Sequence, residues 1–140
     1  MPVTWLQNDG VSNEFIVDLR RALRSTGTEF SADAKSAEAV LTISKEDRSR
    51  RVLSVGSTGK VQEYELHYAI SFRVSDAAGK ERLPEQSISR LRDYSFDQND
   101  VLAKQSEESL LYRDMRRDVI NEILRRLQKL RQKARDETGG

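Results

Sequence analysis

Cysteine is absent from this chain of 140 residues. Its absence excludes a disulfide framework, a thiolate metal site and a cysteine nucleophile. No apolar run is long enough for a membrane-spanning helix. A large excess of one charge is also missing, because 24 basic and 23 acidic side chains leave a net charge of +1. Steering of the whole molecule toward nucleic acid or a membrane is therefore weak, and any electrostatic function must come from local clusters.

The length fits one domain, which can bury a core without a metal or disulfide staple. No repeat, low-complexity segment or linker divides the sequence. We predict a single α/β domain over residues 1–135 and a disordered tail over 136–140. No signal peptide precedes the first strand-like residues, so we expect either a cytoplasmic protein or one whose targeting segment is not part of this sequence.

The first 27 residues predict a strand, a turn and a helix. Residues 3–7 are rich in β-branched and aromatic side chains, and 8–10 form a turn signal. Ser12 is a plausible N-cap, although Phe15 stands where a capping box has an acid. An apolar stripe at helical spacing follows, and Gly27 lies where a helix C-cap favours glycine.

Three further strands are predicted. The first covers 39–55, with a polar middle at 46–51 that we expect to be solvated or bulged, and hairpin turns follow at 56–59 and 76–79. The second, 63–74, alternates strictly, which predicts a buried face of Tyr64, Leu66, Tyr68, Ile70, Phe72 and Val74. Its opposite face, with Glu65, His67, Ser71 and Arg73, should remain accessible. The third strand covers 87–96.

From residue 99 the pattern becomes helical for about 30 residues, with an apolar stripe at Leu111, Met115, Val119, Ile123, Leu127 and Leu130. These elements predict an α+β fold. We expect a two-layer sandwich of a four-stranded, mostly antiparallel sheet with two helices packed on one face. The first strand and helix form a crossover against a three-stranded meander, and the other sheet face is polar.

Catalytic groups are scarce. His67 is the only histidine, and it falls on the polar face of its strand, where Glu65 is the nearest acid that could orient it. Glu107 and Glu108 are neighbours on a helix, so their side chains diverge by about 100°. The stretch 56–60 resembles a phosphate loop faintly but joins two strands instead of opening a helix. We therefore predict a protein that is not an enzyme and uses no cofactor or metal.

Two basic clusters are more informative. One lies at the end of the last helix, at Arg125, Arg126, Lys129, Arg131, Lys133 and Arg135. It is either a solvated helix terminus or a phosphate-binding patch. The second set comprises Arg48, Arg50, Arg51, Lys60, Arg90, Arg92 and Lys104. The predicted sheet could bring some of its members together, and both residue types suit anionic phosphates.

The order of motifs resembles the LptE family, whose members are partners of the LptD outer-membrane barrel. The resemblance covers residues 3–130. It rests on an ordered set of short motifs: Leu-Arg-Ser-Thr-Gly at 23–27, Glu-Tyr-Glu-Leu at 63–66, Arg-Asp-Tyr-Ser-Phe-Asp at 92–97, Val-Leu-Ala-Lys at 101–104 before two acids at 107–108, and Met-Arg-Arg-Asp at 115–118.

The resemblance implies a lipoprotein on the periplasmic face of the outer membrane, which plugs an LptD-type barrel in a one-to-one complex and binds lipopolysaccharide during its export. The family's lipid-modified N-terminal cysteine is missing here, so the implied anchor lies outside this sequence. Lys104 matches the family's lipopolysaccharide-contacting lysine. The basic hairpin position of the family is Ser57 here, and Lys60 is its nearest substitute. We add Arg50 and Arg92 to the expected lipopolysaccharide-binding residues.

Two rival interpretations belong to other classes. A nucleic-acid-binding domain could use the basic C-terminal helix, but no aromatic residues are interleaved with its cations. A small hydrolase is disfavoured by the single histidine and the lack of a nucleophile motif. We therefore expect no nucleic-acid partner.

Overall fold

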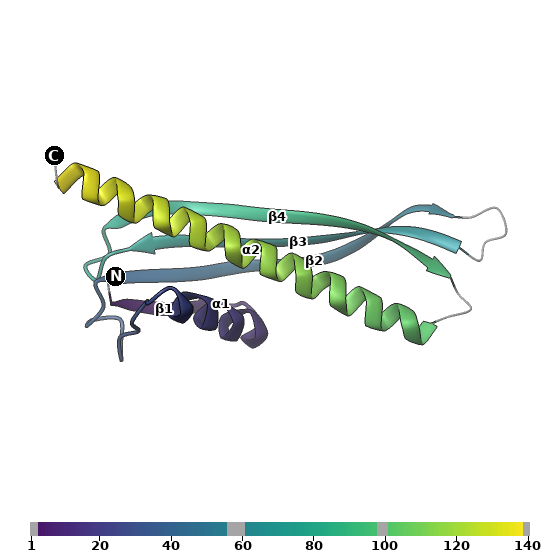
Figure 1. The fold of residues 1–140 in the computed structure, drawn as a ribbon, viewed down its shortest axis with the longest axis horizontal. Coiled ribbons are helices and arrows are strands. Elements are labelled where there is room, and N and C mark those ends of the chain that lie inside the picture. Colours follow the sequence, from purple (N-terminus) through teal and green to yellow (C-terminus); the bar gives the residue numbers. More distant parts are fainter. Residues whose placement is uncertain (1–2, 56–60, 98–100, 139–140) are drawn as a thin grey trace.

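The computed structural model describes residues 3–55, 61–97 and 101–138. The elements follow in the order β1 (Thr4–Asp9), α1 (Asn13–Ser25), β2 (Ala39–Val55), β3 (Val61–Ser75), β4 (Glu81–Asp97) and α2 (Val101–Thr138). They form one sheet in the order β1-β2-β3-β4. Only the β1–β2 pair is parallel. The predicted α+β sandwich, with its mostly antiparallel sheet and two helices, is confirmed (Figure 1).

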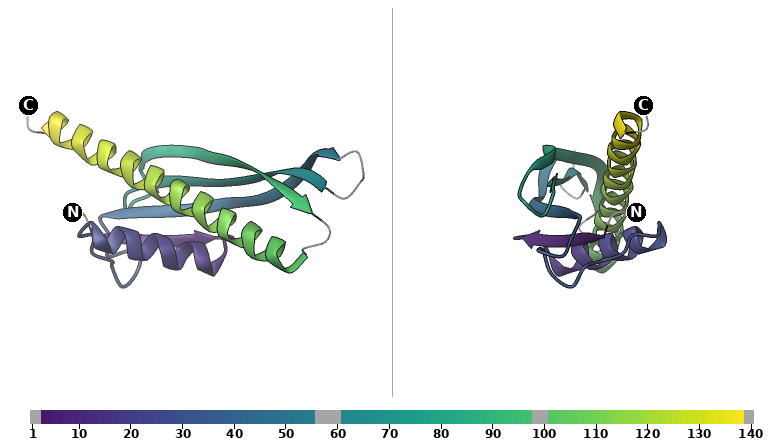
Figure 2. Two further views of the ribbon diagram at one scale, coloured as in Figure 1. Left: turned by 45° about the vertical axis from the view of Figure 1, so that its right-hand side comes forward. Right: turned by 90° about the vertical axis from the view of Figure 1, so that its left-hand side faces the viewer.

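The sheet has two unequal ends, because β2, β3 and β4 are much longer than β1. Helix α1 lies beside β1, whereas α2 crosses the three long strands diagonally (Figures 1 and 2). We call the part with β1, α1 and strand residues 39–44, 70–75 and 81–88 the two-helix end. The part with strand residues 46–55, 61–68 and 90–97, covered only by the first half of α2, is the one-helix end.

Helix α1 begins and ends as its sequence predicts. The Ser12 side chain accepts a hydrogen bond from the Phe15 backbone N–H at 3.3 Å. Gly27, with φ of 89°, follows the last turn in the left-handed region that favours glycine. The acid that is missing from the local capping box comes from β2, where Glu46 Oε1 accepts a hydrogen bond from the Ser12 N–H at 2.8 Å. A residue 34 positions away therefore completes the cap.

The core lies between the sheet and the two helices. Its fully buried members include Phe15 and Leu19 from α1, Ile43 and Phe72 from the sheet, and Met115, Val119 and Ile123 from α2. The predicted buried face of β3 is confirmed from Leu66 to Val74, while Tyr64 is only partly buried. The prediction that Ser71 is accessible was wrong. Ser71 is only 7% exposed, and it pairs with Ser44 and Ser87 on the two neighbouring strands.

Two element bounds differ from the prediction. Strand β4 begins at Glu81, because Pro84 sits in an irregular stretch of an edge strand, where a missing N–H breaks no ladder. Helix α2 has 38 residues and continues to Thr138. Residues 136–138 are therefore helical where a tail was predicted, since no glycine or proline interrupts the helix before Gly139. The hairpin predicted at 56–59 lies outside the described residues.

Candidate functional site

A β-bulge in β2 decides which cations face α2. Ser44 pairs with Ser71, but the next pair is Asp47 with Ala69, so β2 contains one residue more than β3 over this stretch. Lys45, at φ of 54°, adopts the left-handed conformation within the bulge. Because successive side chains alternate between faces, the extra residue transfers the even-numbered positions to the helix-covered face. Arg48 and Arg50 therefore point toward α2, and Arg51 does not.

The sheet register arranges four arginines in two rows on this face. Arg48 pairs with Tyr68, which pairs with Arg90 on β4. In the next row Arg50 pairs with Leu66, which pairs with Arg92. Neighbouring strands are about 4.8 Å apart, so the two arginines of a row lie about 10 Å apart at their Cα atoms. The structure thus brings together Arg50 and Arg92, two of the four residues expected to bind lipopolysaccharide.

Tyrosine rings fill the space between these arginines and α2. All four tyrosines of the sequence lie here: Tyr64, Tyr68, Tyr94 and Tyr112. The guanidinium of Arg48 lies 4.1 Å from the ring centroid of Tyr112, and that of Arg50 lies 4.7 Å from that of Tyr64. The rings of Tyr64 and Tyr94 stack at 5.6 Å. We call these four tyrosines, together with Arg48, Arg50, Arg90 and Arg92, the tyrosine–arginine layer.

Three acidic side chains, Glu46, Glu108 and Asp118, pair with members of the layer. Glu108 of α2 accepts a hydrogen bond from the Tyr94 hydroxyl at 2.6 Å and pairs with Arg50 at 3.3 Å. Asp118, further along α2, pairs with Arg92. Tyr68 donates a hydrogen bond to Glu46 Oε2 at 2.5 Å. The sequence predicted none of these pairings, although Glu108 and Asp118 stand within its motifs, because the partners are distant in the chain.

Burial raises the pKa of Tyr68, Tyr94 and Tyr112. Burial, helped by the hydrogen bond to Glu46, raises the pKa of Tyr68 well above its usual value. Burial and the hydrogen bond to Glu108 raise the pKa of Tyr94 to about 12. The Tyr94 hydroxyl in turn raises the pKa of Arg50, with Glu108 contributing. The layer therefore presents neutral phenols and permanent cations rather than groups that exchange protons near neutral pH.

The layer remains open at its edges. The side chain of Arg50 is 48% exposed and that of Arg92 is 38% exposed. Ion pairs at such exposure contribute about 0–1 kcal/mol. A phosphate can therefore replace Glu108 or Asp118 as a partner with little loss, since a guanidinium binds phosphate oxygens in the same forked geometry.

The two predicted lysines are less fully placed. Lys104 lies in the first turn of α2, one helical turn before Glu108. Its side chain is outside the described part of the structure. Lys60 is among the residues that the structure does not describe. No contact of either lysine with the arginine rows is therefore established, and their role stays a prediction.

The outer face of the sheet carries ordinary surface pairs. Arg51 pairs with Glu65 at 3.0 Å, which removes it from the predicted cationic set. His67 lies 3.3 Å from Asp47 and 3.4 Å from the Ser49 hydroxyl, not beside Glu65 as the sequence suggested. Within the described ranges no group of three or more potential metal ligands is found. No helix there has both the length and the apolarity needed to cross a membrane.

The basic C-terminal half of α2 is partly neutralised by its own helix. Arg125 pairs with Glu122 at 2.8 Å, and Arg126 lies 3.6 Å from the same carboxylate. These contacts lower the pKa of Glu122, mainly through the hydrogen bond from Arg125. Arg126 also donates to the Gln86 side chain of β4 at 2.9 Å. Arg126 therefore helps to hold the helix on the sheet, whereas Arg125 pairs within α2.

Comparison with known proteins decides the identity of this fold. The model of the lipopolysaccharide-assembly family LptE matches residues 3–127. The chain belongs to the LptE family. This assignment confirms the resemblance recognised in the order of its motifs and gives no support to the nucleic-acid interpretation of the C-terminal helix. No curated protein matches the sequence.

Solved structures agree with the LptE assignment. The crystal structure of the rare lipoprotein B from Shewanella oneidensis has a TM-score of 0.80 and 30% identity, covering 94% of this chain and 97% of that one. The solution structure of an uncharacterized lipoprotein B from Nitrosomonas europaea has a TM-score of 0.80 and 29% identity, covering 96% and 86%. A minor lipoprotein from Acinetobacter baumannii shares the fold at 23% identity, with a TM-score of 0.75 and 91% coverage of both chains.

Proposed function

We propose that this LptE-family protein is a non-catalytic subunit that plugs and supports an LptD-type barrel in a one-to-one complex and binds lipopolysaccharide during export. The observation that carries the proposal is the family match over residues 3–127. The proposal includes a location on the periplasmic face of the outer membrane and an N-terminal lipid anchor. The similar structures from three bacteria, all described as lipoproteins, support it.

A plug inside an outer-membrane barrel needs a polar surface, because the lumen of such barrels is polar. The outer sheet face meets this requirement with Arg51, Glu65 and Arg73, all at least partly accessible. This support is physical compatibility, and the partner itself is identified through the family.

For lipopolysaccharide we propose Arg50, Arg92 and Lys104 at the one-helix end, together with Lys60, which precedes β3 in the sequence. Lipopolysaccharide carries phosphates close to its acyl chains, so its receptor needs cations beside a modest apolar surface. Arg50 and Arg92 flank Leu66 on one face, and the tyrosine rings supply apolar surface between them. Lys104 enters α2 at the same end of the molecule.

The partner is tested by co-expression with the LptD-type barrel of the same organism. We expect the two chains to copurify at a one-to-one ratio, measured by native mass spectrometry. Recovery of the barrel alone, with this protein folded but unbound, would reject the plug proposal.

The ligand is tested with the double variant Lys60→Glu/Lys104→Glu. We expect lipopolysaccharide binding to weaken at least tenfold at low salt, with an unchanged melting temperature. The matched control is Lys35→Glu/Lys80→Glu, which alters net charge equally at two exposed sites of the two-helix end. Equal binding by the parent and both double variants would exclude Lys60 and Lys104 from the site.

A further inference from the structure

A second cationic surface lies between the two helices, next to the tyrosine–arginine layer along α2. A groove of about 690 Å³ runs between α1 and α2. Its lining includes one acid and four arginines, namely Asp18, Arg21, Arg113, Arg116 and Arg117. We call this surface the interhelical groove.

Only one of the four arginines is neutralised. Arg116 is 14% exposed, donates to Asp18 at 2.8 Å and lies 3.4 Å from Glu14. The Asp18 carboxylate is thereby paired with Arg116. Arg21, Arg113 and Arg117 are exposed, and within the described ranges no ion pair or side-chain hydrogen bond is recorded for them. Three cations from two helices thus converge on one groove without compensating carboxylates of their own.

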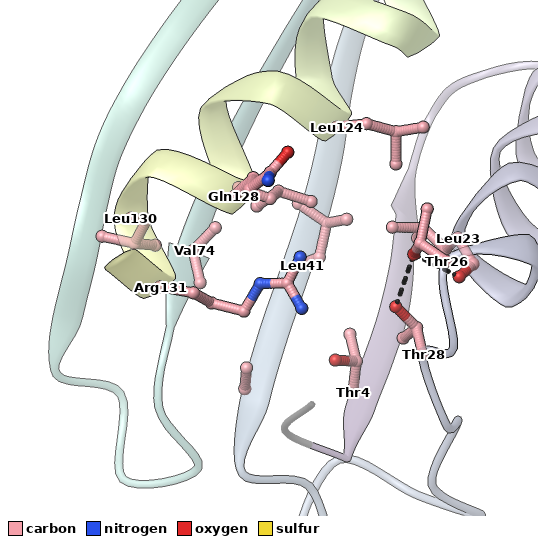
Figure 3. Close-up of a pocket in the computed structure, with 12 residues that line it drawn as sticks. Thr4, Leu23, Thr26, Thr28, Leu41, Val74, Leu124, Gln128, Leu130 and Arg131 are labelled. Atoms are coloured by element: carbon pink, nitrogen blue, oxygen red, sulfur yellow. Dashed lines mark hydrogen bonds between the residues drawn. The ribbon is translucent and has the colours of Figure 1, made fainter. Parts of the chain in front are cut away.

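A separate apolar pocket lies further along α1 and α2. It has a volume of about 370 Å³, and its apolar lining comprises Leu23, Leu41, Val74, Leu124, Leu127 and Leu130. Figure 3 shows Leu23 of α1, Leu41 and Val74 of the sheet, and Leu124 and Leu130 of α2 around the pocket, with the Arg131 side chain extending from α2 across it. The volume falls within the range of about 300–1,000 Å³ that is usual for small-molecule sites.

The groove and the pocket are lined by neighbouring residues on both helices. On α1, Ala22 lines the groove and the next residue, Leu23, lines the pocket. On α2, Asn121 belongs to the groove and Leu124, less than one turn later, belongs to the pocket. The stripe of α2 that faces α1 therefore changes from arginine to leucine along its length.

We propose that the interhelical groove and its apolar pocket bind one phospholipid with a phosphate monoester headgroup. The phosphate is held by Arg21, Arg113 and Arg117, since guanidinium forks match phosphate oxygens. One acyl chain enters the pocket, and its transfer from water to an apolar environment favours binding. The pocket has room for a single chain, so a lipid with one or two chains fits better than a glycolipid with many. The lining of this site includes none of the residues proposed for lipopolysaccharide, Lys60, Lys104, Arg50 and Arg92.

The test uses lysophosphatidic acid, which has one chain and one phosphate, below its critical micelle concentration. Isothermal titration calorimetry should show one-to-one binding to the full chain. The variant Arg21→Gln/Arg113→Gln/Arg117→Gln should bind at least tenfold more weakly. The control Arg51→Gln/Arg73→Gln/Arg82→Gln removes the same charge from strand residues outside the groove and should bind like the parent. Absence of binding to the parent, or equal loss in both triple variants, would overturn the proposal.

The apolar half is tested by filling the pocket. The variant Leu127→Phe should remain folded and bind lysophosphatidic acid at least tenfold more weakly. If its melting temperature falls, Leu124→Phe replaces it with the same expected result. Inorganic phosphate and uncharged monoacylglycerol should each bind at least tenfold more weakly than lysophosphatidic acid. Equal affinity for inorganic phosphate would refute the acyl-chain site, and equal affinity for monoacylglycerol would refute the arginine site. Because no arm uses the barrel or lipopolysaccharide, failure here leaves the family function untouched, and the reverse also holds.

Discussion

The two ends of the sandwich cover the inner face of the sheet with different kinds of side chain. At the two-helix end, α1 and α2 together cover the sheet, and the interior is made of aliphatic and phenylalanine side chains such as Phe15, Ile43 and Phe72. At the one-helix end a single helix covers three strands, and the tyrosine–arginine layer takes over. Side chains with an apolar body and a polar tip suit that place, because their bodies cover the sheet while their tips reach water or an acid.

This difference separates stability from binding. The two-helix end excludes water and holds the domain together through hydrophobic burial. The one-helix end keeps Arg50 and Arg92 half-exposed and pairs them with replaceable acids. Mutations should therefore affect the free energy of unfolding most at the first end and lipopolysaccharide affinity most at the second.

The largest expected effect is that of Phe72→Ala at the two-helix end. Phe72 is fully buried, so its truncation should lower the free energy of unfolding by about 3–5 kcal/mol. Urea denaturation measures the change. Tyr64→Ala, at a partly buried site of the other end, serves as the comparison and should have a clearly smaller effect. If both variants lose the same stability, the two ends do not differ as described.

At the junction of the two ends, Tyr68→Phe should have an intermediate effect. The substitution removes the hydrogen bond to Glu46, which also caps α1 through Ser12. Hydrogen bonds to charged groups contribute about 1.5–3 kcal/mol. We therefore expect the free energy of unfolding, measured by urea denaturation, to fall by an amount in that range. An unchanged midpoint would show that the phenol only fills space.

Raising the pH should weaken the one-helix end first. The folded pKa of Tyr94 is about 12, above the ordinary value of 10.0. A raised folded pKa means that the stabilisation is complete below pH 10 and is lost as the pH rises toward 12. The free energy of unfolding should therefore fall over this interval, and the fall should be shallower in Tyr94→Phe. Identical pH profiles of parent and variant would contradict this assignment.

The smallest effect on stability is expected for Arg92→Gln, since an exposed ion pair contributes about 0–1 kcal/mol. Lipopolysaccharide affinity should nevertheless fall severalfold, as measured by surface plasmon resonance at low salt. Arg51→Gln is the matched control, because it removes the same charge from the opposite face of the sheet. Equal affinities of the two variants would remove Arg92 from the proposed site.

Much of the fold could be predicted from local patterns. The alternation in β3 indicated its buried face from Leu66 to Val74, and the stripe in α2 indicated Met115, Val119 and Ile123. Ser12 and Gly27 marked the ends of α1. These features depend on a few neighbouring residues, so a single sequence contains them. The ordered motifs also identified the family.

The candidate sites were predicted less well. The sequence set Arg48, Arg50 and Arg51 side by side without indicating which would face the helix. Nor did it show that Glu46 would cap a distant helix or that Arg21 would meet Arg113 and Arg117. Each of these pairings joins elements far apart in the chain, and none has a local signal.

By itself the sequence determined the element order, the two amphipathic helices and the alternating strand that together require a two-layer fold. Only the tertiary structure decided which cations share a surface. The bulge at Lys45 determines this, because side chains alternate between the two faces of a strand. One additional residue therefore moves the side chains of β2 that follow it to the opposite face. The polar run predicted a solvated or bulged stretch at 46–51, but the left-handed residue is a lysine rather than a glycine, so the sequence did not mark the bulge at Lys45. Pairing with β3 and packing under α2 select it, and Arg50 thereby comes to lie beside Leu66 and across from Arg92.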